Sequence, residues 1–147
     1  PRQRVCGANS WRVQTVLVVG TAATALRHAV DTKAEVRRNR KRVLMICQVQ
    51  PEGDALSCLI ALHRWMQLLG ADSAMYIATT AGITPEYRWL RGVDEAHVGT
   101  PPEDSAERTL FTVDCGSAER VGDEELVKAA PRVINIDHHG DNTRFGD

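Results

Sequence analysis

The chain of 147 residues lacks several features that would mark particular classes of protein. Its longest apolar candidate, residues 13–26, is shorter than the roughly 18 residues of a membrane span and is diluted with threonine and glycine. A formal net charge of -1 gives neither a global basic excess for nucleic acid nor an acidic bias toward disorder. We find no internal repeat and no low-complexity segment. Any phosphate-bearing ligand must therefore be held by local groups.

Cysteine pairs of the CxxC type are also absent, although the chain contains Cys6, Cys47, Cys58 and Cys115. Three of these lie in or beside apolar stretches. This placement favours free, buried or half-buried thiols in a reducing cytosol over a disulfide pair. We therefore expect a cytoplasmic protein, with room for one domain and a hydrophobic core.

The first 30 residues differ from the rest in charge. Arg2, Arg4, Arg12 and Arg27 all precede the first acid, Asp31. An arginine-bearing leader without acids is typical of a transit peptide, and a fraying tail can have the same composition. We predict that residues 1–30 are an N-terminal extension, either a tail or a leader, and that residues 31–147 form the functional domain.

Apolar runs of strand length alternate with helical segments through the rest of the chain. The expected strands cover residues 42–49, 73–78, 109–117 and 132–139, and the expected helices cover residues 22–41, 54–70, 84–92 and 123–130. Unbroken apolar strands separated by helices are typical of a parallel sheet that is covered on both faces. The sequence therefore predicts an α/β fold with an open, mostly parallel, doubly wound sheet of the Rossmann-like kind, with helices on both faces.

Three of the four expected strands end in side chains that can bind a metal ion. The first is followed by Gln48, Glu52 and Asp54, the third by Asp114, and the fourth by Asp137, His138 and His139. Taken singly, each group can be explained as a helix cap, a turn acid or an exposed histidine pair. However, ligands of an open parallel sheet bind beyond the carboxyl ends of the strands, where the strand order reverses. The convergence therefore predicts a divalent metal site at this edge of the sheet.

These motifs resemble the DHH phosphoesterase superfamily. The resemblance rests on "PEGDA" before a helix, "VDCG" at the end of a strand and "INIDHHGDNTRFGD" after the last one, and it covers about residues 43–147. The pattern is similar to the branch of bacterial oligoribonucleases that also remove phosphate from adenosine 3′,5′-bisphosphate. The resemblance implies a hydrolase of the exonuclease kind that uses two divalent ions, commonly Mn²⁺, with Mg²⁺ as the alternative.

The resemblance also implies which residues would hold these ions. Asp114 would bridge both of them. Asp54 and His138 would hold the second ion together with Asp114, and Gln48 and Glu52 would hold the first. Hard oxygen ligands combined with imidazole suit Mn²⁺ better than thiolates would.

Two further residues complete the implied site. Asp137 would orient or support it, and His139 would meet the phosphate of the substrate. The chain departs from the family pattern at the first ion, because the family usually has histidine at the position of Gln48 and aspartate at that of Glu52. An amide oxygen is a weak ligand, and the extra methylene of glutamate displaces its carboxylate. We therefore expect at most one tightly bound Mn²⁺ and impaired catalysis.

Family members continue into a separate substrate-binding domain, so we expect this phosphoesterase domain to be truncated before it. The substrate stays open among a short oligonucleotide, a nucleotide bisphosphate and a cyclic dinucleotide. No membrane partner is expected, and the oligomeric state is open, with a homodimer as one option. The alternative function is a non-catalytic nucleotide-binding or regulatory module on a degenerate DHH fold. A plain dinucleotide binder is poorly supported, because "VVGTAATA" from Val18 has one glycine where GxGxxG would need three.

Overall fold

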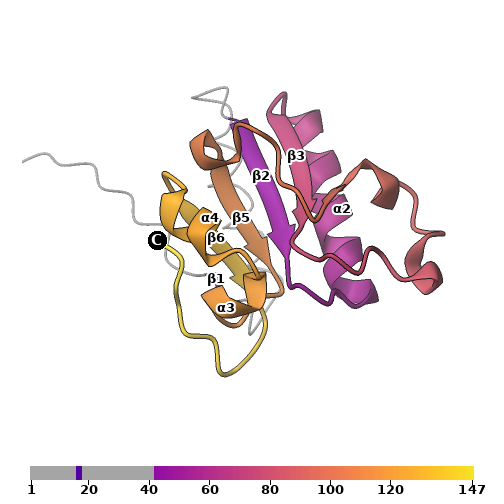
Figure 1. Cartoon of the computed structure of the whole chain (residues 1–147). Coiled ribbons are helices and arrows are strands. Elements are labelled where there is room, and N and C mark those ends of the chain that lie inside the picture. The colour runs from indigo at the N-terminus through magenta and orange to yellow at the C-terminus, as the bar shows by residue number, and fades with distance from the viewer. Residues whose placement is uncertain (1–15, 18–41) are drawn as a thin grey trace, which may run out of the picture.

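The computed structural model describes residues 16–17 and 42–147 (Figure 1), so the helix expected over residues 22–41 lies outside the described residues. The described part forms one six-stranded sheet in which every pair of neighbouring strands is parallel. Its strands are β1 (Val16–Leu17), β2 (Arg42–Cys47), β3 (Asp72–Ile77), β4 (His97–Val98), β5 (Thr109–Val113) and β6 (Val133–Asp137). The prediction of an open parallel sheet is confirmed.

The strands follow the order β1-β6-β5-β2-β3-β4 across the sheet. From β2 the chain moves outward to β3 and β4, and it then returns to β5 on the other side of β2 and moves outward again to β6. The strand order therefore reverses between β2 and β5, which is where an open α/β sheet binds its ligands. Strand β1 pairs with β6, with Leu17 opposite Asp137, although it lies in the segment that its charge pattern set apart as an extension.

Helices connect the strands, together with three short 3-10 turns. In the described residues the α-helices are α2 (Gly53–Leu68), α3 (Ala118–Val121) and α4 (Glu124–Ala129), and the 3-10 turns are η1 (Pro85–Tyr87), η2 (Val93–Glu95) and η3 (Ser105–Glu107). The helix expected over residues 54–70 is confirmed as α2, and Gly70 follows it with a left-handed φ of 80°. The segment 84–92 is helical only over η1, which begins at Pro85 directly after Thr84.

The helices lie on both faces of the sheet, as the alternation predicted. Successive residues of a strand point to opposite faces, and both faces of β2 are buried. Val43 and Met45 pack in the cluster that contains residues of α2, whereas Leu44 and Ile46 pack with Val121 of α3 and with α4. Because both faces are covered, β2 is apolar along its length rather than alternating with polar residues.

A buried arginine joins the ends of the strands that lie away from the switch point. The side chain of Arg108 is 9% exposed. Its Nη1 donates to the carbonyl of Val43 at 3.3 Å and to the carbonyl of Asp72 at 3.1 Å. Its Nε donates to Asp104 at 2.8 Å, and this hydrogen bond lowers the pKa of the Asp104 carboxyl to about 2. The guanidinium thus links the amino ends of β2 and β3 to the segment before β5.

The three cysteines of the described part are free, two of them buried and Cys58 exposed. Burial raises the pKa of the Cys47 thiol to about 12 and also raises that of Cys115, so both remain protonated at neutral pH. No helix among the described residues is long and apolar enough to cross a membrane.

Replacing Arg108 with methionine should lower the free energy of unfolding by about 2 kcal/mol, because buried carbonyl oxygens would lose their donor. Urea denaturation measures this change. Arg42→Gln is the matched control, since Arg42 also pairs with Asp104 at 2.9 Å but is exposed. The midpoint should fall clearly for Arg108→Met and only slightly for Arg42→Gln. Equal falls in the midpoint would show that the buried guanidinium of Arg108 contributes no more to the free energy of unfolding than the exposed one of Arg42.

Candidate functional site

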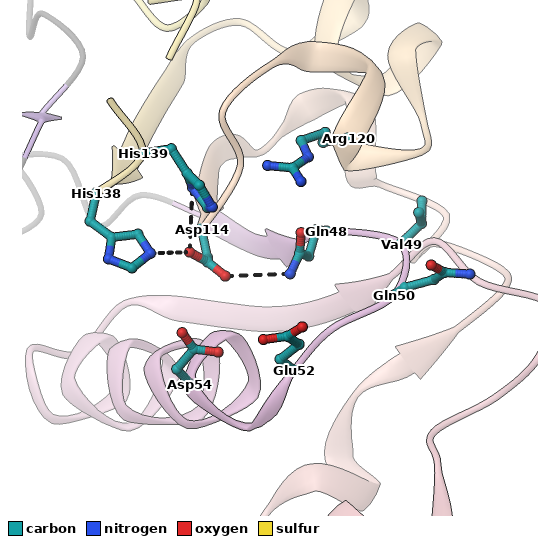
Figure 2. Close-up of a pocket in the computed structure, with 9 residues that line it drawn as sticks. All are labelled: Gln48, Val49, Gln50, Glu52, Asp54, Asp114, Arg120, His138 and His139. Carbon is teal, nitrogen blue, oxygen red and sulfur yellow. Dashed lines mark hydrogen bonds and ion pairs between the residues drawn. The ribbon is translucent and has the colours of Figure 1, made fainter. Parts of the chain in front are cut away.

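The carboxyl ends of β2, β5 and β6 open into one cleft of about 430 Å³ at the switch point (Figure 2), here called the site cleft. Its lining comes from the segment between β2 and α2, the first turn of α2, the end of β5, the end of β6, and α3. The lining residues are Gln48, Val49, Gln50, Glu52, Asp54, Asp114, Arg120, His138 and His139. The predicted site residues are therefore brought together, except that Asp137 lies buried beside the cleft rather than in its lining.

Asp114 occupies the centre of the cleft in an unusual backbone conformation. Its φ of 59° is left-handed, a region in which aspartate is tolerated better than most residues. Its backbone N–H still donates to the carbonyl of Ile136 at 2.9 Å, so the turn begins directly at the end of the β5–β6 ladder. Strain of this kind persists where the surroundings hold it in place, and it is frequent at functional sites. Here the turn directs the carboxylate into the cleft.

Both histidines lie against this carboxylate. Nε2 of His138 is 3.2 Å from Oδ1 of Asp114, and Nδ1 of His139 is 3.7 Å from the same oxygen. The three residues can offer one ligand atom each, all within 4.8 Å of one another. An anionic oxygen with two imidazoles is a donor set that suits a divalent transition-metal ion.

The carboxylate of Asp137 holds His139 in position. Its side chain is fully buried, and its Oδ1 lies 2.7 Å from Nδ1 of His139. Its Oδ2 accepts hydrogen bonds from the backbone N–H of His139 at 3.3 Å and from Nδ2 of Asn142 at 2.5 Å. Burial by itself would raise the pKa of Asp137, but the hydrogen bonds from Asn142 and His139 outweigh it and lower the pKa.

The same contact determines how His139 presents its ring. The hydrogen bond to Asp137 raises the pKa of His139 above its ordinary value. When Nδ1 donates to a carboxylate, the neutral ring keeps its free electron pair on Nε2. A carboxylate behind a histidine in this way orients the ring and increases its basicity, which is common around metal sites.

Asn142, which donates to Asp137, is itself held by the side chain of Asn135. Asn135 is fully buried, and its Nδ2 donates to Thr112 Oγ1 at 2.8 Å and to the carbonyl of Cys115 at 2.9 Å. Its Oδ1 accepts from Nδ2 of Asn142 at 2.8 Å. These bonds connect β5, β6 and the loop after the histidines, and they leave the buried amide of Asn135 with partners for both its nitrogen and its oxygen.

Gln48, Glu52 and Asp54 face Asp114 from the β2–α2 side of the cleft (Figure 2). Nε2 of Gln48 donates to Oδ2 of Asp114 over a long 3.5 Å, so this amide presents its nitrogen to the carboxylate. Burial, followed by the negative charge of Asp54, raises the pKa of Asp114. Carboxylates that repel one another in this way are stabilised by a bound cation. The donor set and its charge therefore fit a divalent metal ion.

Several residues of the site were not predicted from the sequence, among them Arg120 and Asn142. No helix was predicted between the glycine turn after β5 and residue 123, so the prediction of α3 was missed. A signal was present, because Ser117 suits a helix N-cap and Gly122 suits a helix end, and the structure has them in these two positions around α3. Asn142 had no such local signal, because its partners lie in other elements.

The pairing of Asp137 with His139 should make stability depend on pH. The pKa of His139 is raised above 6.5, so its contribution is complete below that pH and is lost as the pH rises through the raised value. The pKa of Asp137 is lowered below 3.8, so its contribution is present above that pH and is lost as the pH falls through the lowered value.

His139→Gln should therefore destabilise the protein most between about pH 4 and pH 6.5, and less at about pH 9. Urea denaturation in the presence of a chelator measures this difference. His97→Gln is the control, since His97 is exposed in the short strand β4. A destabilisation by His139→Gln that is constant from pH 4 to pH 9 would show that the pair does not act through charge.

A sequence model of the DHH family, N-terminal domain, matches residues 42–146. The chain is 31% identical over 106 residues to the bifunctional oligoribonuclease and PAP phosphatase NrnA of Thermus thermophilus, a match that covers 71% of this chain and 30% of that protein. It therefore spans about a third of the length of this relative. The crystal structure of an exopolyphosphatase-related protein from Bacteroides fragilis has the same fold, with a TM-score of 0.71, 17% identity, and coverage of 82% of this chain and 37% of that one. With motifs, fold and site cleft in agreement, the chain belongs to the DHH family, whose N-terminal domain it contains.

Proposed function

We propose that this chain is a metal-dependent phosphoesterase domain that acts on short oligonucleotides or nucleotide phosphates. The observation that carries the proposal is the grouping of Asp114, His138 and His139 within 4.8 Å at the switch point of the sheet. The name of the relative from Thermus thermophilus, an oligoribonuclease and PAP phosphatase, supports this class of substrate. The substrate would enter the site cleft, whose volume of about 430 Å³ is in the range of small-ligand sites.

Asp114, Asp54 and His138 would hold one ion, with Mn²⁺ or Mg²⁺ as the candidates. The carboxylate of Asp114 can contact two ions, and Glu52 and Gln48 would offer the ligands of the other. Divalent ions supply positive charge for phosphoryl oxygens and lower the pKa of water when they are bound at such a site. The type of residue at position 48 supports a weakened first site, because the neutral amide of Gln48 is a weaker ligand than the imidazole of the family pattern.

The chain's own residues would orient the substrate and move a proton. His139 is fixed by Asp137. Because its pKa is raised, a larger fraction of its rings is protonated at neutral pH than in an ordinary histidine. Such a group can donate a hydrogen bond to a phosphoryl oxygen or a proton to the leaving oxygen. Asp137 does not touch the substrate in this scheme; it positions the imidazole and stabilises its charged form. Asn142 and Asn135 in turn hold Asp137 in place.

A non-catalytic nucleotide-binding module is the second candidate, and the neutral amide of Gln48 on the side of the first ion favours it. With one ion instead of two, the chain could still bind a phosphate but would lose the paired charges that stabilise both the entering and the leaving oxygen. Turnover of a model phosphodiester in the presence of Mn²⁺ distinguishes the two candidates. An enzyme forms product, whereas a binding module shows saturable affinity for nucleotide without product.

Calorimetric titration with Mn²⁺ should show one tight site per chain. Asp114→Asn should weaken it at least about 100-fold, because a neutral amide would replace the shared carboxylate, and even removal of a supporting partner costs ~10–100-fold. Asp94→Asn is the matched control, since Asp94 is an exposed acid of η2 outside the site cleft, and it should leave binding unchanged. Two tight sites of similar affinity in the parent would contradict the proposed weakening of the first ion.

Restoring the family pattern should increase activity. The double change Gln48→His with Glu52→Asp should raise the Mn²⁺-dependent initial rate on bis(p-nitrophenyl) phosphate by about tenfold or more, roughly 1.4 kcal/mol of activation free energy. The gain should exceed the sum of the gains of the single changes, because both ions act as a unit. Gln50→His is the control, since it places an imidazole in the exposed lining at a position that the family pattern does not use.

Two results would count against this explanation of weak catalysis. The first is a double variant that binds two ions and yet hydrolyses the diester no faster than the parent. The second is an equal gain from Gln50→His, which would mean that any added imidazole in the site cleft promotes hydrolysis.

A further inference from the structure

Among the residues that the structure describes, Arg120 is the one arginine or lysine in the lining of the site cleft. The lining also contains the acids Glu52, Asp54 and Asp114, so that a fixed positive charge is exceptional there. Figure 2 shows the side chain of Arg120 across the cleft from Glu52 and Asp54, and separated from His138 by His139. This separation follows from the fold, because α2 carries Asp54 on one face of the sheet and α3 carries Arg120 on the other.

The guanidinium of Arg120 has no carboxylate partner among the described residues. Arg42, Arg64 and Arg108, by contrast, are each held in ion pairs with nearby acids. Arg120 is exposed, and its Nη1 would lie 3.8 Å from a Cβ placed on Gly116. The same Cβ would lie 3.6 Å from Cβ of His139, so the guanidinium and His139 flank one glycine. The charge of Arg120 is therefore available to a ligand in the cleft.

The backbone that carries Arg120 is fixed to the rim of the cleft. Its carbonyl accepts a hydrogen bond from the N–H of Val49 at 3.1 Å. Gly122, which ends α3, packs so closely that an added Cβ would lie 1.8 Å from Cγ1 of Val49. Because Val49 itself lines the cleft, α3 cannot move away from the cleft without breaking these contacts. The side chain thus starts from a defined position, which reduces the entropy lost when it binds a ligand.

From these observations, and resting on the proposed function, we propose that Arg120 binds a second phosphate of the substrate, which is not the phosphate that is hydrolysed. The guanidinium offers a planar fork of donors that matches two phosphate oxygens. The acidic side of the cleft would hold the reacting phosphate only with the help of cations, whereas Arg120 attracts phosphate by itself. The preferred substrates are then nucleoside bisphosphates and short oligonucleotides with a terminal phosphate, which carry two phosphates on one nucleoside.

Equilibrium binding tests this assignment without turnover. Adenosine 3′,5′-bisphosphate and adenosine 5′-monophosphate are titrated in the presence of Mg²⁺ and followed by NMR chemical shifts, which also measure weak affinities. The parent should bind the bisphosphate at least about fivefold more tightly than the monophosphate, a difference of ~1 kcal/mol. Arg120→Gln should remove this preference and leave the affinity for the monophosphate within twofold. Arg120→Lys should keep part of the preference, because it retains the charge without the fork.

Arg91→Gln is the matched control, since Arg91 is exposed and lies outside the site cleft, and it should keep the full preference. Thermal unfolding confirms that the exposed substitutions leave the fold intact. The assignment is overturned if the parent has no preference for the bisphosphate, or if the preference survives in Arg120→Gln. It is also overturned if Arg120→Gln weakens both ligands equally, since Arg120 would then hold the phosphate that the two ligands share.

Hydrolysis of bis(p-nitrophenyl) phosphate with Mn²⁺ is measured alongside, because this substrate has one phosphate and tests the proposed function alone. No hydrolysis, combined with a bisphosphate preference that depends on Arg120, would reject the enzyme and retain the second phosphate site. Hydrolysis without that dependence would reject the second phosphate site and retain the enzyme.

Discussion

The buried carboxylate of Asp137 is the group on which the rest of the site depends. A charge without exposure to water must be satisfied by the protein, and here Asn142 and the ring and backbone of His139 satisfy it. These partners come from the strand end, the histidine pair and the following loop, so a single carboxylate sets the relative position of all three. The low dielectric around Asp137 strengthens its attraction to His139. The same low dielectric would make the loss of a hydrogen-bond partner of Asp137 costly in free energy.

The site cleft divides into two regions of opposite charge. Glu52, Asp54 and Asp114 make one side attractive to cations, and the pKa of Asp114 is raised by burial first and then by the negative charge of Asp54. Arg120 makes the other side attractive to anions. The two regions therefore favour different ligand groups, cations on one side of the cleft and anions on the other. The arrangement arises because the strand order reverses between β2 and β5, which brings elements from both faces of the sheet to one opening.

The departures of Gln48 and Glu52 from the family pattern affect one part of this arrangement only. Both lie in the segment between β2 and α2, whereas His138 and His139 follow β6 and meet Asp114 there. Gln48 is the residue that connects the two sides, because its Nε2 lies 3.5 Å from Oδ2 of Asp114. The network beneath the histidines is complete, with Asn135 and Asn142 both hydrogen bonded. The support of His139 by Asp137 thus involves neither Gln48 nor Glu52.

Sequence alone determined strands β2, β3, β5 and β6, helices α2 and α4, and the acid and histidine cluster. These depend on local pattern: apolar runs of strand length, a helix ended by Gly70, and motifs with fixed spacing after the strands. The short strands β1 and β4 and the helix α3 were not predicted. The meeting of the cluster in one cleft followed from the rule for parallel sheets. Only the tertiary structure decided that Asn142 would hold Asp137 and that Arg108 would join two strands. It also decided that Arg120 would face the cleft with no carboxylate partner in the part of the chain that the structure describes. Arg108 lies 65 residues from Val43, whose carbonyl it binds, and no local pattern signals such a contact. Periodicity describes which face a residue occupies, whereas hydrogen bonds and free charges depend on which distant side chains the fold brings within 3 to 4 Å.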